Sequence, residues 1–144
     1  MEMPLLLPQQ APMVMVDALV SYSESGAVTR LEIRPDNIFV HDGHFTEPGL
    51  VENIAQTAAA HAGYTQTQNG ASTAPVGYIA AVDQLQIFRL PAVFSTIETT
   101  IRIQHQVLNV TIIGGDVTCD GHPVARCEMK IFLRSQGSGQ PAGA

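Results

Sequence analysis

The stretch HDGHFTEPGLVENIAQTAAAHAG, residues 41–63, decides how the rest of the chain is interpreted. From Pro48 onward, apolar residues recur at helical spacing, which predicts an α-helix of about four turns. Proline suits the first position of a helix, and Gly63 stands where this helix is expected to end. The predicted helix is apolar on nearly all sides, so we expect it to be buried. One acidic side chain, Glu52, interrupts its apolar run.

The segments around this helix alternate between apolar and polar residues as β-strands do. Two strands joined by a turn at Ser25 and Gly26 are predicted before the helix, over 13–23 and 27–34. A polar loop is expected after it, at 65–75. Four more strands are then predicted, over 76–90, 97–104, 109–119 and 124–134, with Gly114 and Gly115 as a β-bulge.

A single helix that is apolar on all sides needs a sheet that curls around it. The sequence therefore predicts an α+β protein with a hot-dog fold, in which an antiparallel sheet of about five to six strands wraps one long buried helix. We expect one domain over 1–134 and a disordered tail over 135–144, where SQGSGQPAGA has nothing to bury. Such a sheet leaves an unpaired edge that a second copy can cover, which predicts a dimer.

Composition excludes several classes of protein. The net charge of −6 argues against a nucleic-acid surface, and residues 1–72 hold eight acids against Arg30 and Arg34. No run approaches the roughly 20 apolar residues of a membrane span, and the first residues lack the features of a signal peptide, so we expect a cytoplasmic protein. Cys119 and Cys127 flank a predicted hairpin turn that keeps them too far apart for a disulfide, so both are expected to be reduced.

Two motifs carry a family resemblance over roughly residues 5–134. LLLPQQAPMVMVDALVSYSESGAV at 5–28 and GHFTEPGLVENIAQTAA at 43–59 resemble the 3-hydroxyacyl-(acyl carrier protein) dehydratases, in which Gly-His-Phe precedes a helix that opens with Pro-Gly and carries Glu-x-x-Ala-Gln. The chain looks most similar to the divergent branch associated with aryl-polyene and flexirubin-type pigments. The segment between His-Phe and Pro-Gly is shorter here than in the well-known members.

The resemblance implies the removal of water from 3-hydroxyacyl thioesters bound to acyl carrier protein. His44 is then the base that takes the proton beside the thioester, with His41 as an alternative base. Glu52 is the acid that assists loss of hydroxide, because a carboxyl in apolar surroundings keeps its proton more readily. Free N–H groups of Gly49 and Leu50 at the helix N-terminus would bind the thioester oxygen.

Helical geometry sorts the remaining candidates. Gln56 shares a face with Glu52 and is a candidate for substrate binding, whereas His61 falls about 180° away and is a poor partner for Glu52. His105 and His122 are interpreted as surface residues. We expect no cofactor and no metal, because no cluster of histidine, cysteine and carboxylate residues shows ligand spacing.

The same residues leave other functions open. Glu52 would also serve a hot-dog acyl thioesterase, by activating water or by attacking the thioester. A third hypothesis is a non-catalytic acyl-binding or assembly subunit that pairs with an active dehydratase. Expected partners are acyl carrier protein and either a second copy or a related dehydratase. The carrier is expected to dock on the basic residues of the second half, namely Arg89, Arg102, Arg126, Lys130 and Arg134.

Overall fold

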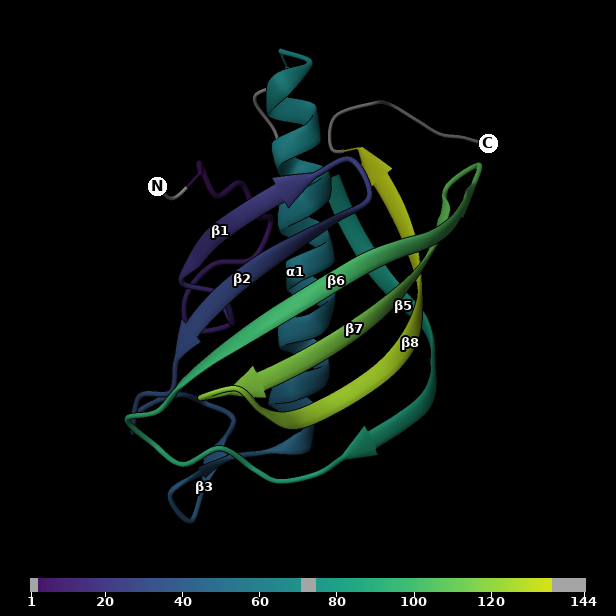
Figure 1. Cartoon of the computed structure of the whole chain (residues 1–144). Coiled ribbons are helices and arrows are strands. Elements are labelled where there is room, and N and C mark those ends of the chain that lie inside the picture. Colours follow the sequence, from purple (N-terminus) through teal and green to yellow (C-terminus); the bar gives the residue numbers. More distant parts are fainter. Residues whose placement is uncertain (1–2, 71–74, 136–144) are drawn as a thin grey trace.

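A curved antiparallel sheet crosses one long central helix (Figure 1). The computed structural model describes residues 3–70 and 75–135. The helix, α1, spans Glu47–Gln68, and the sheet has the strand order β1-β2-β6-β7-β8-β5. Its strands are β1 (Ala18–Ser23), β2 (Gly26–Glu32), β5 (Pro75–Ile87), β6 (Thr96–Val107), β7 (Val110–Cys119) and β8 (His122–Ser135). The predicted hot-dog fold is confirmed.

A short hairpin stands apart from this sheet and leads into the helix. It consists of β3 (Val40–His41) and β4 (His44–Phe45), two strands that the sequence did not predict. The C-terminal tail was expected to begin at residue 135, but Ser135 is the last residue of β8. The remainder of that predicted tail, 136–144, lies outside the described residues.

The helix is longer than its sequence pattern predicts, with 22 residues in place of about four turns. Gly63 was expected to end the helix but lies buried within it. Glycine is needed there because the backbone of Leu6 packs so closely that a β-carbon at this position would collide with the Leu6 carbonyl oxygen. The helix ends at Gln68, Asn69 caps it, and Gly70 follows with a φ of +88°. A glycine within a helix can therefore reflect close packing as well as termination.

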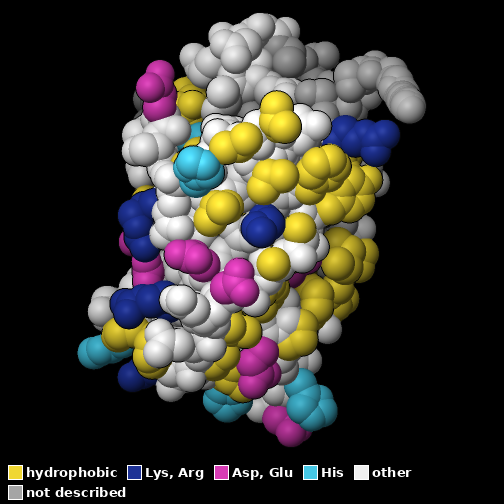
Figure 2. All heavy atoms as spheres, turned by 90° about the vertical axis from the view of Figure 1, so that its right-hand side faces the viewer, with side chains coloured by type: hydrophobic (Ala, Val, Ile, Leu, Met, Phe, Trp, Pro, Cys, Tyr) yellow, Lys and Arg dark blue, Asp and Glu magenta, His cyan; other side chains and the backbone are white. Residues whose placement is uncertain are grey.

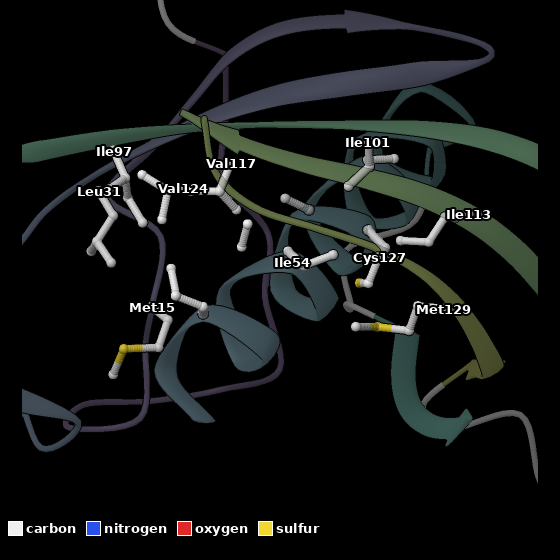
Figure 3. Packing of buried hydrophobic residues seen from close by; sticks show 14 of the residues in the cluster. Met15, Leu31, Ile54, Ile97, Ile101, Ile113, Val117, Val124, Cys127 and Met129 are labelled. Atoms are coloured by element: carbon white, nitrogen blue, oxygen red, sulfur yellow. The ribbon is translucent and has the colours of Figure 1, made fainter. Parts of the chain in front are cut away.

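The core fills the space between the helix and the concave side of the sheet (Figure 3). Ile54 of α1 is fully buried there and packs against Gly115 of β7, where an added β-carbon would lie 2.6 Å from the Ile54 Cγ2 atom. Gly114 and Gly115 pair regularly with Arg102 and Ile101 of β6. The prediction of a bulge at these two glycines is therefore wrong. The irregularity between β6 and β7 lies between Ile103 and His105.

The predicted first strand begins later than expected, at Ala18 in place of residue 13. The backbone of the preceding segment bonds to helix side chains and so does not join a strand. Gln56 Nε2 donates to the Met13 carbonyl at 2.8 Å, and the Met15 N–H donates to Gln56 Oε1 at 2.7 Å. Asn53 Nδ2 donates to the Met15 carbonyl at 2.7 Å. These bonds fix residues 13–15 against α1.

The cysteines are free, as predicted. In the β7–β8 ladder Cys127 lies opposite Gly115, whereas Cys119 lies opposite His122 beside the turn. Asp120 and Gly121 have φ values of 53° and 79°, which suits a tight hairpin turn. Burial, with a smaller contribution from the charge of Asp116, raises the pKa of the Cys127 thiol to about 11. This thiol is therefore protonated at neutral pH.

The two edges of the sheet differ. At one edge, Met3 lies beside β1 and forms an isolated bridge, in which the Met3 N–H donates to the Leu19 carbonyl at 3.0 Å. At the other edge β5 pairs only with β8. Figure 2 shows apolar side chains gathered on the side of the molecule where β5 and β8 lie. They include exposed Tyr78, Ile79, Leu85 and Phe88, with Phe132 of β8 beside them.

Candidate active site

The N-terminus of α1 is tied to the hairpin that precedes it. Both the N–H and the hydroxyl of Thr46 donate to the Phe39 carbonyl, at 3.0 Å and 2.6 Å. Gly49 is buried against Phe45 and Phe39, and a β-carbon at Gly49 would lie 2.6 Å from the Phe45 ring. The absence of a side chain at Gly49 therefore serves internal packing. These contacts fix the orientation of the first turn of the helix relative to the hairpin.

The two N–H groups expected to bind a thioester oxygen differ in availability. The Leu50 N–H donates to the Thr46 carbonyl at 3.1 Å, and the Leu50 side chain is fully buried. The Leu50 N–H is therefore not available to bind a thioester oxygen. The Gly49 N–H stands one position earlier, in the first turn, where helical N–H groups have no partner four residues back. Gly49 remains the candidate donor.

Glu52 is held by Gln56, one turn further along the helix. Gln56 Nε2 donates to Glu52 Oε2 at 2.8 Å, while the rest of the Gln56 amide bonds to the backbone of Met13 and Met15. Gln56 is fully buried, whereas Glu52 is partly exposed. Two backbone contacts thus fix the amide, and the amide fixes one oxygen of the carboxylate. Gln56 therefore positions the Glu52 carboxylate.

A cavity of about 280 Å³ lies beside Glu52, between α1 and the free edge strand β5. Ala55 and Ala59 form its helical wall, and their small side chains leave the space open. The opposite wall comes from Gly77, Tyr78 and Ile79 of β5 together with Ile131 of β8, and Gln9 of the N-terminal segment completes the lining. Glu52 therefore lines a partly open space of mostly apolar character.

The histidines expected to act as the base lie elsewhere in the protomer. His44 is exposed on the β3–β4 hairpin, with Nδ1 3.0 Å from the Asp42 carbonyl oxygen. Because a carbonyl oxygen can only accept, Nδ1 is the donor in this contact. His41 is also exposed, with Nε2 3.3 Å from Asp42 Oδ2. Neither histidine lines the cavity beside Glu52.

His61 lies away from Glu52, as the helical geometry predicts. Its Nε2 donates to the Ser23 carbonyl at 2.8 Å, and its ring stacks on Tyr22 with centroids 4.8 Å apart. Burial lowers the pKa of His61, although hydrogen bonds to backbone carbonyls act in the opposite direction. His61 lines a second cavity of about 700 Å³, which shares Ile131 with the cavity beside Glu52. His105 and His122 are exposed, as expected.

Several residues around Glu52 were not predicted from the sequence. Gln9 lies in the PQQAP segment, whose pattern shows no periodicity that would assign it to a site. Gly77, Tyr78 and Ile79 were recognised as strand residues, but a strand pattern does not indicate which edge of the sheet meets the helix face of Glu52. The helix face that carries Glu52 predicted only one wall of the cavity.

The described residues include no candidate metal site. In residues 3–70 and 75–135 no group of three or more histidine, cysteine and acidic residues is placed to hold a metal.

A cluster of charged residues lies on the neighbouring strands β6, β7 and β8. Asp116 binds Arg102 and Arg126, each with an N–O distance of 2.7 Å. Burial alone would raise the pKa of Asp116, but hydrogen bonds from these two arginines outweigh it and lower that pKa. No helix of the described chain is long and apolar enough to cross a membrane.

Comparison with known proteins adds a family and several related folds. A family model, ApeP-like, described as ApeP dehydratase, matches residues 1–139. A search of curated proteins finds no match. The structure of the dehydratase heterocomplex ApeI:P from Xenorhabdus doucetiae is similar with a TM-score of 0.84 at 16% identity, covering 90% of this chain and 89% of that one.

More distant structures share the fold. The PaaI protein from the phenylacetic acid degradation operon of E. coli matches with a TM-score of 0.62 at 16% identity, over 79% of this chain and 80% of that one. A hypothetical thioesterase from Streptococcus pneumoniae with coenzyme A matches with a TM-score of 0.64 at 12% identity, over 83% and 87%. At these identities the likeness concerns the fold alone.

Proposed function

The chain belongs to the ApeP-like dehydratase family, and from this premise we propose that it removes water from 3-hydroxyacyl thioesters carried on acyl carrier protein. The observation that carries the proposal is the position of Glu52, which Gln56 holds at the wall of a cavity between the helix and β5. The cavity is lined by small and apolar side chains on the helix and the sheet. An acyl chain suits such surroundings.

The acid step is assigned to Glu52. Loss of hydroxide needs a proton donor, and a carboxyl group beside the 3-hydroxyl supplies one. Gln56 Nε2 binds Glu52 Oε2, which leaves the other oxygen of the carboxyl group to carry the proton. Because Gln56 is itself fixed to the backbone of Met13 and Met15, the carboxyl group is held in position before substrate arrives.

The base is assigned to His44 of a second protomer, with His41 as the alternative. In the resembling dehydratases the base and the acid face each other across a dimer interface. This assignment is supported by the exposed position of His44 within one protomer and by a cavity wall that is itself the free edge strand β5. Pairing along β5 would cover the exposed apolar side chains there and close the cavity.

Stabilisation of the thioester oxygen falls to Gly49. A helix N-terminus provides N–H groups and a positive dipole end for the charge that develops on this oxygen. The N–H of Leu50 is bonded to Thr46, so Gly49 takes this role alone in the proposal. A donor of this kind typically lowers the activation barrier by about 3 kcal/mol.

The acyl chain is proposed to run from Glu52 toward the larger cavity. Ile131 lines both spaces, and Ala58 and Ala62 continue the small-residue wall that Ala55 and Ala59 begin. Along the helix axis, Glu52 and His61 are about 13 Å apart. Ile131 therefore stands where a chain would pass from one space into the other.

Acyl carrier protein is proposed to dock through local positive charge on the second half of the chain. Two of the five basic residues expected to take part, Arg102 and Arg126, bind Asp116, which reduces their charge for a partner. The remaining residues, Arg89, Lys130 and Arg134, are exposed. Attraction at such a surface is screened by salt, so docking should weaken as ionic strength rises.

The decisive experiment compares Glu52→Gln and His44→Ala with the wild type on a 3-hydroxyacyl carrier substrate. Each substitution should lower kcat by about 10²-fold to 10⁴-fold, because each removes one proton-transfer step. His105→Ala, at an exposed histidine away from the cavity, should leave kcat unchanged. Wild-type turnover by Glu52→Gln would contradict the proposal, and release of free thiol without enoyl product would indicate a thioesterase.

One observation favours a second candidate function, that of a non-catalytic assembly subunit. The exposed apolar side chains on β5 suit a related dehydratase as well as a second copy. The similar structure from Xenorhabdus doucetiae is a dehydratase heterocomplex. Purification from the native cells separates the two candidates: a heteromer whose activity survives Glu52→Gln supports the assembly subunit, and an active homodimer supports the enzyme.

A further inference from the structure

One buried polar atom near the cavity has no partner. Gln9 Oε1 is shielded from solvent and makes no hydrogen bond, and it is the single side-chain atom of this kind among the described residues. Buried polar atoms in native proteins are nearly always hydrogen-bonded, so an exception needs an explanation. Gln9 also lines the cavity beside Glu52, which suggests that a ligand in this cavity supplies the missing partner.

The chemistry of the atom narrows the kind of ligand group. An amide oxygen only accepts hydrogen bonds, so its partner must carry an O–H or an N–H. A thioester oxygen cannot fill this role, whereas a hydroxyl group can. The terminal torsion of a glutamine side chain is broad, so rotation about it can turn the amide oxygen toward a group in the cavity.

We propose that Gln9 is a substrate-binding residue whose amide oxygen accepts a hydrogen bond from the 3-hydroxyl group. The proposal rests on the function proposed above and names a second protein contact to the leaving group. Protonated Glu52 donates to the hydroxyl oxygen, and the hydrogen of the same hydroxyl points to Gln9. The two residues line the same cavity, from the helix and from the N-terminal segment.

This arrangement orients the leaving group without a covalent step at Gln9. The base takes the proton beside the thioester, the released electron pair forms the carbon–carbon double bond, and the carbon–oxygen bond breaks. The departing oxygen keeps its own hydrogen, bonded to Gln9, and gains the Glu52 proton, so it leaves as water. Holding the hydroxyl hydrogen on Gln9 turns a lone pair of the oxygen toward Glu52.

Binding in a background without turnover tests the proposal. Calorimetry would compare Glu52→Gln with Glu52→Gln/Gln9→Leu, using a 3-hydroxyacyl pantetheine thioester and the same thioester without the hydroxyl. The single variant should prefer the hydroxylated ligand, and Gln9→Leu should lower that preference by about fivefold to tenfold, as expected for one lost hydrogen bond. Gln10→Leu, at the exposed neighbour, is the matched control and should keep the preference.

A stability measurement separates ligand binding from a structural role. Leucine removes an unsatisfied acceptor, so Gln9→Leu in the otherwise wild-type protein should unfold at the same or a higher temperature while its kcat/KM falls. An unchanged ligand preference, a lower unfolding temperature, or no binding of either thioester would overturn the proposal. If the wild type binds with the expected preference but forms no enoyl product, the dehydratase function fails while the role of Gln9 stands.

Discussion

Polar residues on two sides of the same helix differ in burial and in hydrogen bonding. On the side of Asn53 and Thr57, each polar side chain is fully buried and bonded within the protein: Asn53 to Met15 and Thr99, and Thr57 to Thr29. On the side of Glu52, one oxygen is held by Gln56 and a cavity of about 280 Å³ lies alongside. The polar residues of the first side serve folding, whereas in our proposal Glu52 on the second side serves a ligand. Substitutions on the two sides should therefore have separable effects.

The largest effect on stability is expected from Asn53→Ala. The change leaves the Met15 carbonyl and the Thr99 hydroxyl without their bonds and opens a void, which should lower the free energy of unfolding by about 3 kcal/mol. Urea denaturation measures this. Gln68→Ala, at the exposed end of the same helix, should change the value by about 0.5 kcal/mol or less. Equal losses from both variants would contradict the comparison.

On the cavity side, Glu52→Gln should spare stability and remove activity. Glutamine keeps the size of glutamate, so we expect the free energy of unfolding to change by about 1 kcal/mol or less, while kcat falls as stated above. Unfolding and turnover would be measured on the same preparation. If this variant were destabilised as much as Asn53→Ala, the carboxylate would belong to the folding side of the helix.

Filling the cavity gives a third, smaller effect. Ala55→Leu adds volume at the helical wall, so it should raise KM or lower kcat/KM by about tenfold while the free energy of unfolding stays within about 1 kcal/mol. Ala55→Ser keeps nearly the original volume and serves as the control. Steady-state kinetics with a 3-hydroxyacyl thioester are the measurement. Unaltered kinetics in Ala55→Leu would show that the substrate binds elsewhere.

The smallest effect concerns pH and His61. Because burial lowers its pKa, the folded protein holds the neutral ring and the unfolded chain binds more protons. The resulting stability is fully present above about pH 6.5 and is lost as the pH falls below it toward the folded pKa. Unfolding at pH 8 and pH 5.5 should show this loss in the wild type and a smaller one in His61→Gln. The same loss in both would exclude His61 as its source.

Sequence patterns predicted what depends on neighbours along the chain. Local periodicity predicted the six strands of the main sheet and a helix that carries Glu52, and these elements are found in the structure. Their starts differ, because the helix begins at Glu47 in place of Pro48 and the first strand begins at Ala18. Contacts between distant segments were not predicted. Leu6 packs against Gly63 and Ile54 packs against Gly115, so these glycines serve packing where the pattern suggested a helix end and a bulge.

The candidate site divides along the same line. The helical motif indicated Glu52 and Gln56, and their hydrogen bond follows from a separation of one turn. Gln9 and Tyr78 reach the cavity only through tertiary folding, from an irregular segment and from an edge strand. No spacing in the sequence links these residues with Glu52, so the second wall of the cavity required the structure.

The bridge between Met3 and Leu19 has a consequence for how copies of the chain would assemble. A sheet with two open edges can add copies at both, which leads to ribbons that grow without end. Here Met3 already occupies part of the β1 edge, whereas β5 is an edge strand with pairing on one side only among the described residues. Pairing of two copies through β5 would therefore use up the strand that invites further addition. If copies pair through β5, we therefore expect the N-terminal segment to act as a terminator of polymer growth, which would protect a protein with an apolar edge from aggregation.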